Sequence, residues 1–182
     1  MPRNKDHLQL ALYARPKHPG SYHYAFFIAP KNLQGPVTKH HVKNTLQIDA
    51  SGEAIQPWRY ERTTILDVEA EPRLLARIII AKVAKSTDDV QRILGGVPIY
   101  QVEELNKAEA QTSTCRTWVS DVLRALSRQE ALAANLGEWE DVEREALEYL
   151  DRKRARGRWE TTWKGGPGTP LVDLLKGREI VE

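Results

Sequence analysis

Cys115 is the single cysteine of the 182-residue chain and a candidate nucleophile. It stands in the first turn of a helix predicted to begin near residue 113, with N-cap candidates at 112–114. A helix N-terminus presents free N–H groups and partial positive charge, which favour the thiolate, lower the thiol pKa and stabilise an oxyanion. The alternative interpretation is a buried, inert cysteine on the apolar face of the helix. That face comprises Cys115, Trp118, Val119, Val122, Leu123 and Leu126.

Histidines in two neighbouring predicted strands are candidates for the base that a thiol nucleophile needs. His23 lies inside the aromatic segment 21–29, where a merely solvated histidine is not expected. His40 and His41 lie in the next strand, with Asn44 close by. Because side chains alternate between the faces of a strand, only one of His40 and His41 can face His23. The alternative for this pair is a solvated polar surface, since lysines flank it on both sides.

Three segments together resemble the circularly permuted papain-like superfamily, in particular its lecithin–retinol acyltransferase and NlpC-type branch. They are HYAFFI at 23–28, HHVKN at 40–44 and CRTWV at 115–119. The chain is also similar to small fungal proteins of unassigned function with a Cys-x-Thr-Trp-Val helix start. In that superfamily the histidines precede the cysteine, and a strand-borne His and a polar residue on the next strand meet a Cys at a helix N-terminus.

The resemblance implies roles for individual residues. Cys115 would be the nucleophile, His23 the base and His41 the orienting third member. His40 would replace His41 if the register differs, and Asn44 is a further alternative for the third position. The implied chemistry is acyl transfer from an acyl-bearing substrate through an acyl-cysteine intermediate, with either hydrolysis or transfer as the outcome.

A basic run near the C-terminus offers a second feature to interpret. One interpretation is a solvated helix end whose cations complement the helix dipole. The other is a patch for phosphate or an RNA backbone. It motivates an alternative function, in which a cyclodipeptide-type transferase of a fungal biosynthetic pathway takes aminoacyl groups from tRNA. A third hypothesis is a non-catalytic binding module on the same fold. The cations of the run are Arg152, Lys153, Arg154, Arg156 and Arg158.

Composition limits the other classes of function. The formal net charge is +2, which is not the signature of a dedicated nucleic-acid binder. One cysteine allows no intrachain disulfide and no multi-cysteine zinc site, and adjacent His40 and His41 would diverge rather than chelate, so we expect no metal and no cofactor. The longest apolar run, 78–81, is too short to span a membrane, and no secretory signal is recognised. We therefore expect an intracellular protein.

The predicted elements place these residues in an α+β fold, as one domain over 1–182 with a core at 7–155 and a tail at 156–182. An antiparallel sheet in the N-terminal half is expected to pack against C-terminal helices. The expected strands are 7–15, 21–29, 37–48, 58–66 and 74–84, with a short extended piece at 97–102. The expected helices are 86–94, the one that begins near 113, 137–155 and 171–176.

Overall fold

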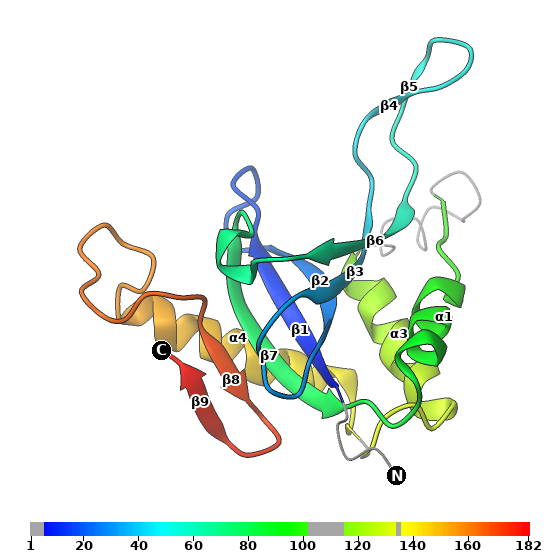
Figure 1. Ribbon diagram of the computed structural model, residues 1–182. Helices are drawn as coiled ribbons and strands as arrows, with labels where there is room; N and C mark the ends of the chain where they lie inside the picture. Colours follow the sequence, from blue (N-terminus) through cyan, green and yellow to red (C-terminus); the bar gives the residue numbers. More distant parts are fainter. Residues whose placement is uncertain (1–5, 102–114, 134–135) are drawn as a thin grey trace.

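A computed structural model describes residues 6–101, 115–133 and 136–182 (Figure 1). Within these residues, seven strands form one sheet in the order β6-β3-β2-β1-β7-β8-β9, and a separate two-stranded ribbon consists of β4 and β5. The strands are β1 (His7–Ala14), β2 (Tyr22–Ala29), β3 (Val37–Lys43), β4 (Gln47–Ile48), β5 (Ala54–Ile55), β6 (Arg59–Ile65), β7 (Leu74–Lys82), β8 (Leu171–Asp173) and β9 (Arg178–Val181). The helices are α1 (Thr87–Gly96), α3 (Cys115–Arg128) and α4 (Trp139–Ala155), with a short 3-10 turn η1 (Val68–Ala70).

The centre of the sheet follows the predicted pattern. Strand β1 pairs antiparallel with both β2 and β7, and β2 pairs antiparallel with β3. Leu8, Leu10 and Leu12 of β1 share one face and are fully buried. Strand β7 contains three consecutive isoleucines at 78–80, all buried, as expected for a β-branched run covered on both faces. The α+β class and the antiparallel arrangement of the first strands are therefore confirmed.

The helices lie on the face of the sheet to which the three β1 leucines point. The periodic residues of α3, from Cys115 to Leu126, and the apolar stripe of α4 join the same core cluster. A smaller cluster, which includes Phe27 and Val37, lies on the opposite face. Helix α1 begins at its predicted cap, because the Ser86 side chain accepts from the Asp89 N–H, and it continues through both glycines to Gly96. The N-cap candidates at 112–114 lie outside the described residues.

The strand predicted over 37–48 is wrong beyond Lys43. The chain leaves the sheet there, and the β4–β5 ribbon projects from the body of the molecule (Figure 1). Leu46 and Ile48, apolar residues of the predicted strand, are 61% and 66% exposed. A local turn closes the ribbon, in which the Asp49 carboxylate accepts from two backbone N–H groups and Gly52 adopts a φ of +88°.

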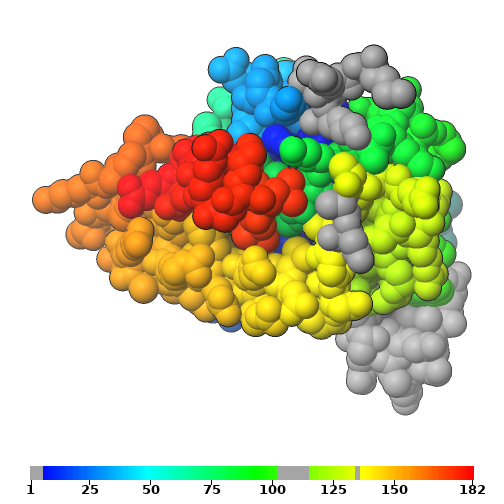
Figure 2. Space-filling view, turned by 90° about the horizontal axis from the view of Figure 1, so that it is seen from below, coloured from blue at the N-terminus to red at the C-terminus, as the bar shows by residue number. Residues whose placement is uncertain are grey.

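The helix predicted over 171–176 is also wrong, and the C-terminal segment is part of the sheet. Strand β8 runs parallel to β7, and β9 returns antiparallel to β8. The segment 171–175 is too short for its periodicity to distinguish a helix from a strand. It forms a strand because it pairs with the edge of β7 that β1 leaves free. Figure 2 shows this segment against α4, where the Tyr149 hydroxyl donates to Glu179 at 2.6 Å. The piece expected to be extended at 97–102 is irregular over 97–101, and residue 102 is outside the described residues.

Candidate active site

The thiol of Cys115 lies at the point where β2 and β3 separate. The pairing of these strands ends at Phe26 and His40, so the backbone N–H of Tyr24 has no partner on β3. It donates instead to Cys115 Sγ at 3.5 Å. Cys115 is the first residue of α3 and is 5% exposed. The sulfur therefore occupies the gap in the sheet and lines the cavity that also contains His23.

A second network holds the start of α3 in place. Glu143 of α4 is buried, and it accepts hydrogen bonds from the Tyr24 hydroxyl at 2.8 Å and from the Arg116 guanidinium. Tyr24 follows His23 on β2, and Arg116 follows Cys115 on α3. One carboxylate thus ties together the two elements that carry the candidate nucleophile and base.

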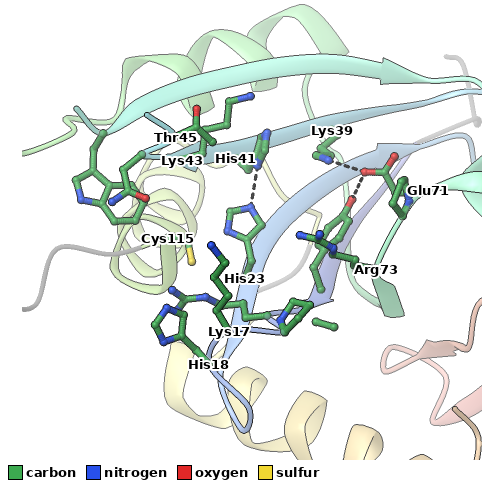
Figure 3. A pocket seen from close by; sticks show the side chains of 17 residues that line it. Lys17, His18, His23, Lys39, His41, Lys43, Thr45, Glu71, Arg73 and Cys115 are labelled. Atoms are coloured by element: carbon green, nitrogen blue, oxygen red, sulfur yellow. Dashed lines mark hydrogen bonds and ion pairs between the residues drawn. The ribbon is translucent and has the colours of Figure 1, made fainter. Parts of the chain in front are cut away.

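The two strand histidines of the resemblance meet in the cavity. His23 Nε2 and His41 Nδ1 are 2.8 Å apart, and Figure 3 shows the two rings directed toward one another. His40 points to the opposite face of β3, where its Nδ1 is 2.7 Å from the Tyr60 hydroxyl and its ring is fully buried. The prediction that only one of the adjacent histidines faces His23 is confirmed. Asn44 lines the same cavity.

Glu61 extends the pair of histidines and was not found from the sequence. Its Oε1 is 3.2 Å from His41 Nε2, and its Oε2 pairs with Lys43 Nζ at 2.5 Å. The signal for this residue is cross-strand register, since Glu61 stands directly opposite His41 in the β3–β6 pairing. The sequence predicted both strands but contained no marker for their register.

The network assigns a tautomer to each ring. The Lys43 ammonium beside Glu61 lowers the pKa of that carboxyl, which is therefore ionised and can only accept. His41 Nε2 then carries a proton and donates it to Glu61, and His41 Nδ1 accepts from His23 Nε2. His23 Nδ1 is left with a free lone pair. It is the ring atom that is available to take a proton from a thiol.

Burial keeps the resting site uncharged. It raises the pKa of the Cys115 thiol, although the Tyr24 N–H, Arg15 and the first-turn N–H groups lower it. The expectation that the helix N-terminus lowers this pKa overall is therefore wrong, because desolvation of the sulfur exceeds the effect of the helix. Burial and the neighbouring His41 and Lys39 lower the pKa of His23 to about 3. The site at rest holds a neutral thiol and neutral imidazoles.

The cavity has a volume of about 870 Å³, large enough for a small organic substrate. Cys115, His23 and His41 lie on its wall, and the turn between β1 and β2 closes another side (Figure 3). In the described residues Cys115 makes no hydrogen bond to a histidine. A substrate in the cavity would therefore contact the Cys115 thiol and the His23 ring as two groups that are not hydrogen-bonded to each other.

The basic run at 152–158 lies mostly against the C-terminal segment of the chain. Each of its cations contacts a protein group; Lys153 is almost fully buried, whereas Arg152, Arg154 and Arg156 remain exposed. The contacts are Arg152 over the Tyr149 ring, Lys153 to Glu179, Arg154 to the Tyr22 hydroxyl and Asp151, Arg156 to Glu182, and Arg158 to the carbonyls of Gly168 and Glu182.

The described segments contain neither a cluster of metal ligands nor a membrane-spanning helix. No group of three or more His, Cys, Asp or Glu side chains in them is arranged to hold a metal ion. None of their helices combines the length and the apolar character needed to cross a lipid bilayer.

Comparison with known proteins gives a family but no function. No curated protein and no solved structure matches the chain significantly. One family model matches residues 5–181, which is almost the whole chain and includes Cys115, His23, His41 and Glu61. The chain therefore belongs to that family, which is described as a family of unknown function (DUF6914).

Proposed function

We propose that the protein catalyses acyl transfer through an acyl-cysteine formed on Cys115. The observation that carries the proposal is the relay His23–His41–Glu61, with contacts of 2.8 and 3.2 Å, whose two histidines line the same cavity as the thiol. A relay of this kind orients an imidazole and leaves one of its nitrogens free to act as a base. The order of these residues along the chain also supports a circularly permuted papain-like fold.

In the first step the sulfur of Cys115 attacks the carbonyl carbon of an ester, amide or thioester. Its proton moves to His23 Nδ1, and the electrons of the carbonyl π bond move to oxygen. Backbone N–H groups at the start of α3 would be the donors for this oxyanion. The tetrahedral intermediate then collapses, the leaving group departs, and it takes the proton from His23.

In the second step water, an amine or an alcohol attacks the acyl-cysteine. The acceptor gives its proton to His23, the C–S bond breaks, and the proton returns to the sulfur. Hydrolase and acyltransferase differ only in this acceptor. His41 acts through His23 as a positioning residue, because its Nδ1 accepts from His23 Nε2 and stabilises the positive charge that His23 gains.

Intact-protein mass spectrometry tests the proposal directly. The protein is incubated with p-nitrophenyl acetate and with S-acetylpantetheine, and a mass increase of one acetyl group on Cys115 is expected. Cys115→Ala should abolish both the adduct and release of the leaving group, and Cys115→Ser should reduce release by about 10³-fold or more. Ser120→Ala, on the same helix outside the cavity, is the matched control. Full leaving-group release by folded Cys115→Ala would refute the proposal.

A non-catalytic binding module is the second candidate, and the protonated, buried state of Cys115 favours it. This candidate predicts no acetyl adduct with either donor and a thiol that iodoacetamide alkylates slowly at pH 6. We do not extend the proposal to an aminoacyl-tRNA donor. Three of the five cations at 152–158 that suggested tRNA, Lys153, Arg156 and Arg158, contact the C-terminal segment of the chain itself.

A further inference from the structure

The charged residues that line the cavity of Cys115 are mainly cations. Among its described lining residues there is one acid, Glu71, and this carboxylate accepts from the Tyr13 hydroxyl at 2.8 Å and pairs with Lys39 at 2.5 Å. The net charge of the wall is therefore strongly positive although the whole chain carries only +2. The lysines and arginines on the wall are Arg15, Lys17, Lys39, Lys43 and Arg73.

Three of these cations have no acidic partner among the described residues. Lys39 pairs with Glu71 and Lys43 pairs with Glu61, whereas Arg15, Lys17 and Arg73 form no ion pair with a residue that the structure describes. Three cations without an acidic partner around one cavity constitute an attractive field for an anion.

The unpaired cations lie together although they are distant in sequence. Arg15 and Lys17 belong to the turn after β1, and Arg73 directly precedes β7. The Ala14 N–H donates to the Arg73 carbonyl at 2.8 Å and joins the two segments. Figure 3 shows Lys17 on the side of His23 that is opposite His41, and Arg73 beside His23 toward Glu71.

Two observations connect this wall to the reacting groups. The charge of Arg15 lowers the pKa of both the Cys115 thiol and His23, so its guanidinium acts on both groups. Arg73 adopts a φ of +63°, a left-handed conformation that costs energy for a residue other than glycine. Such conformations are concentrated at functional sites, where the surrounding structure maintains them.

We propose that the wall formed by Arg15, Lys17 and Arg73, here called the cationic wall, binds an oxyanion on the acyl donor. The oxyanion is a phosphate or a carboxylate, which arginine can bind through two parallel hydrogen bonds. The donor is thus an anionic acyl compound whose carbonyl carbon reaches Cys115 while its charged group contacts the cationic wall. The identity of the ligand as an acyl donor rests on the proposed function, whereas anion binding does not.

Alkylation of the single thiol tests anion binding without requiring acyl transfer. Iodoacetate and iodoacetamide form the same C–S bond and release iodide, but only iodoacetate is anionic. We expect Arg15→Gln/Lys17→Gln/Arg73→Asn to lower the ratio of the iodoacetate rate to the iodoacetamide rate by about tenfold at low salt. Asparagine is chosen at position 73 because it tolerates positive φ.

Two variants keep the test interpretable. Lys31→Gln/Lys85→Gln removes two exposed lysines outside the cavity and should leave the ratio unchanged. The single variant Lys17→Gln, in an exposed turn, should lower the ratio about two- to threefold if the triple variant does not fold. An unchanged ratio in the folded triple variant, or in Lys17→Gln if only that variant folds, would overturn the proposal.

Competition then separates the two sources of the oxyanion. Pyrophosphate or citrate is added at constant ionic strength, and protection of Cys115 from iodoacetamide is measured. Protection by pyrophosphate alone identifies a phosphate, protection by citrate alone identifies a carboxylate, and protection by neither overturns the proposal.

A last comparison separates this proposal from the proposed function. Acetyl-coenzyme A carries phosphates and S-acetylpantetheine does not, and both contain the same thioester. If alkylation is anion-selective but neither donor acetylates Cys115, acyl transfer fails and the anion site stands. If both donors acetylate Cys115 and alkylation shows no selectivity, the cationic wall fails and acyl transfer stands.

Discussion

His40 and His41 are adjacent residues of the same type, yet the structure gives them different environments. His41 lies at the cavity, with His23 on one ring nitrogen and Glu61 on the other. His40 lies in the core, where it contacts the Tyr60 hydroxyl and its Nε2 has no partner in the described residues. Burial lowers the pKa of both rings. Burial alone therefore does not identify a functional histidine, whereas its partners and its access to a cavity do.

The basic run at 152–158 and the cationic wall also differ in the groups that their side chains contact. The run at 152–158 is dense in the sequence, but its side chains contact Glu179, Glu182 and nearby carbonyls. The cationic wall is assembled from two separate segments and has no acidic partner among the described residues. A conspicuous charge run can thus serve the fold, whereas scattered charges surround the candidate site.

Among the histidines, the largest effect is expected for His23, the proposed base. His23→Ala removes the base and should lower the rate of acetyl-cysteine formation by about 10³-fold. The measurement is the pre-steady-state release of p-nitrophenol, with circular dichroism to confirm folding. A folded variant with unchanged release would show that His23 is not the base.

A smaller effect is expected for His41, which acts through His23. His41→Ala should lower the same rate by about 10²-fold, and His41→Asn should restore part of it because the Asn Oδ1 can accept from His23 Nε2. Rescue by Asn distinguishes positioning from simple packing. Equal losses in the Ala and Asn variants would contradict the tautomer assignment.

Substitution of His40 should reduce the stability of the protein but hardly change the rate. His40→Ala leaves a cavity and an unpartnered Tyr60 hydroxyl in the core, and should lower the free energy of unfolding by about 2 kcal/mol. The rate per folded molecule should stay within about twofold of the wild type. Urea unfolding combined with p-nitrophenol release measures both quantities. A large loss of rate without a loss of stability would reverse the roles of His40 and His41.

The smallest effect is a pH dependence of stability. Burial lowers the pKa of His40 to about 4, so below its ordinary value of 6.5 the unfolded chain binds a proton that the native protein does not. Stability is thus lost as the pH falls from 6.5 toward 4. From pH 7.5 to 5.5 His40 should account for about 1 kcal/mol. Urea titrations of the wild type and His40→Phe measure this difference, and parallel pH profiles would contradict it.

Local sequence patterns predicted the elements that carry the site. The alternation of β1, the three isoleucines of β7 and the periodicity after Cys115 each depend on neighbouring residues alone. The pattern failed at Leu46 and Ile48, because the chain leaves the sheet after Lys43 and turns back at Asp49 within the β4–β5 ribbon. It also failed at Leu171, because pairing with β7 outweighed a helical propensity.

The sequence by itself determined the single thiol, the strand that carries His23 and the opposite orientation of His40 and His41. Tertiary structure decided which of the two reaches His23, that Glu61 completes the relay, and that Tyr24 donates its N–H to the sulfur. It also decided that the thiol is protonated, because burial depends on how α3 packs into the gap between β2 and β3. These properties arise from contacts between residues 18 to 91 positions apart, which no local pattern encodes.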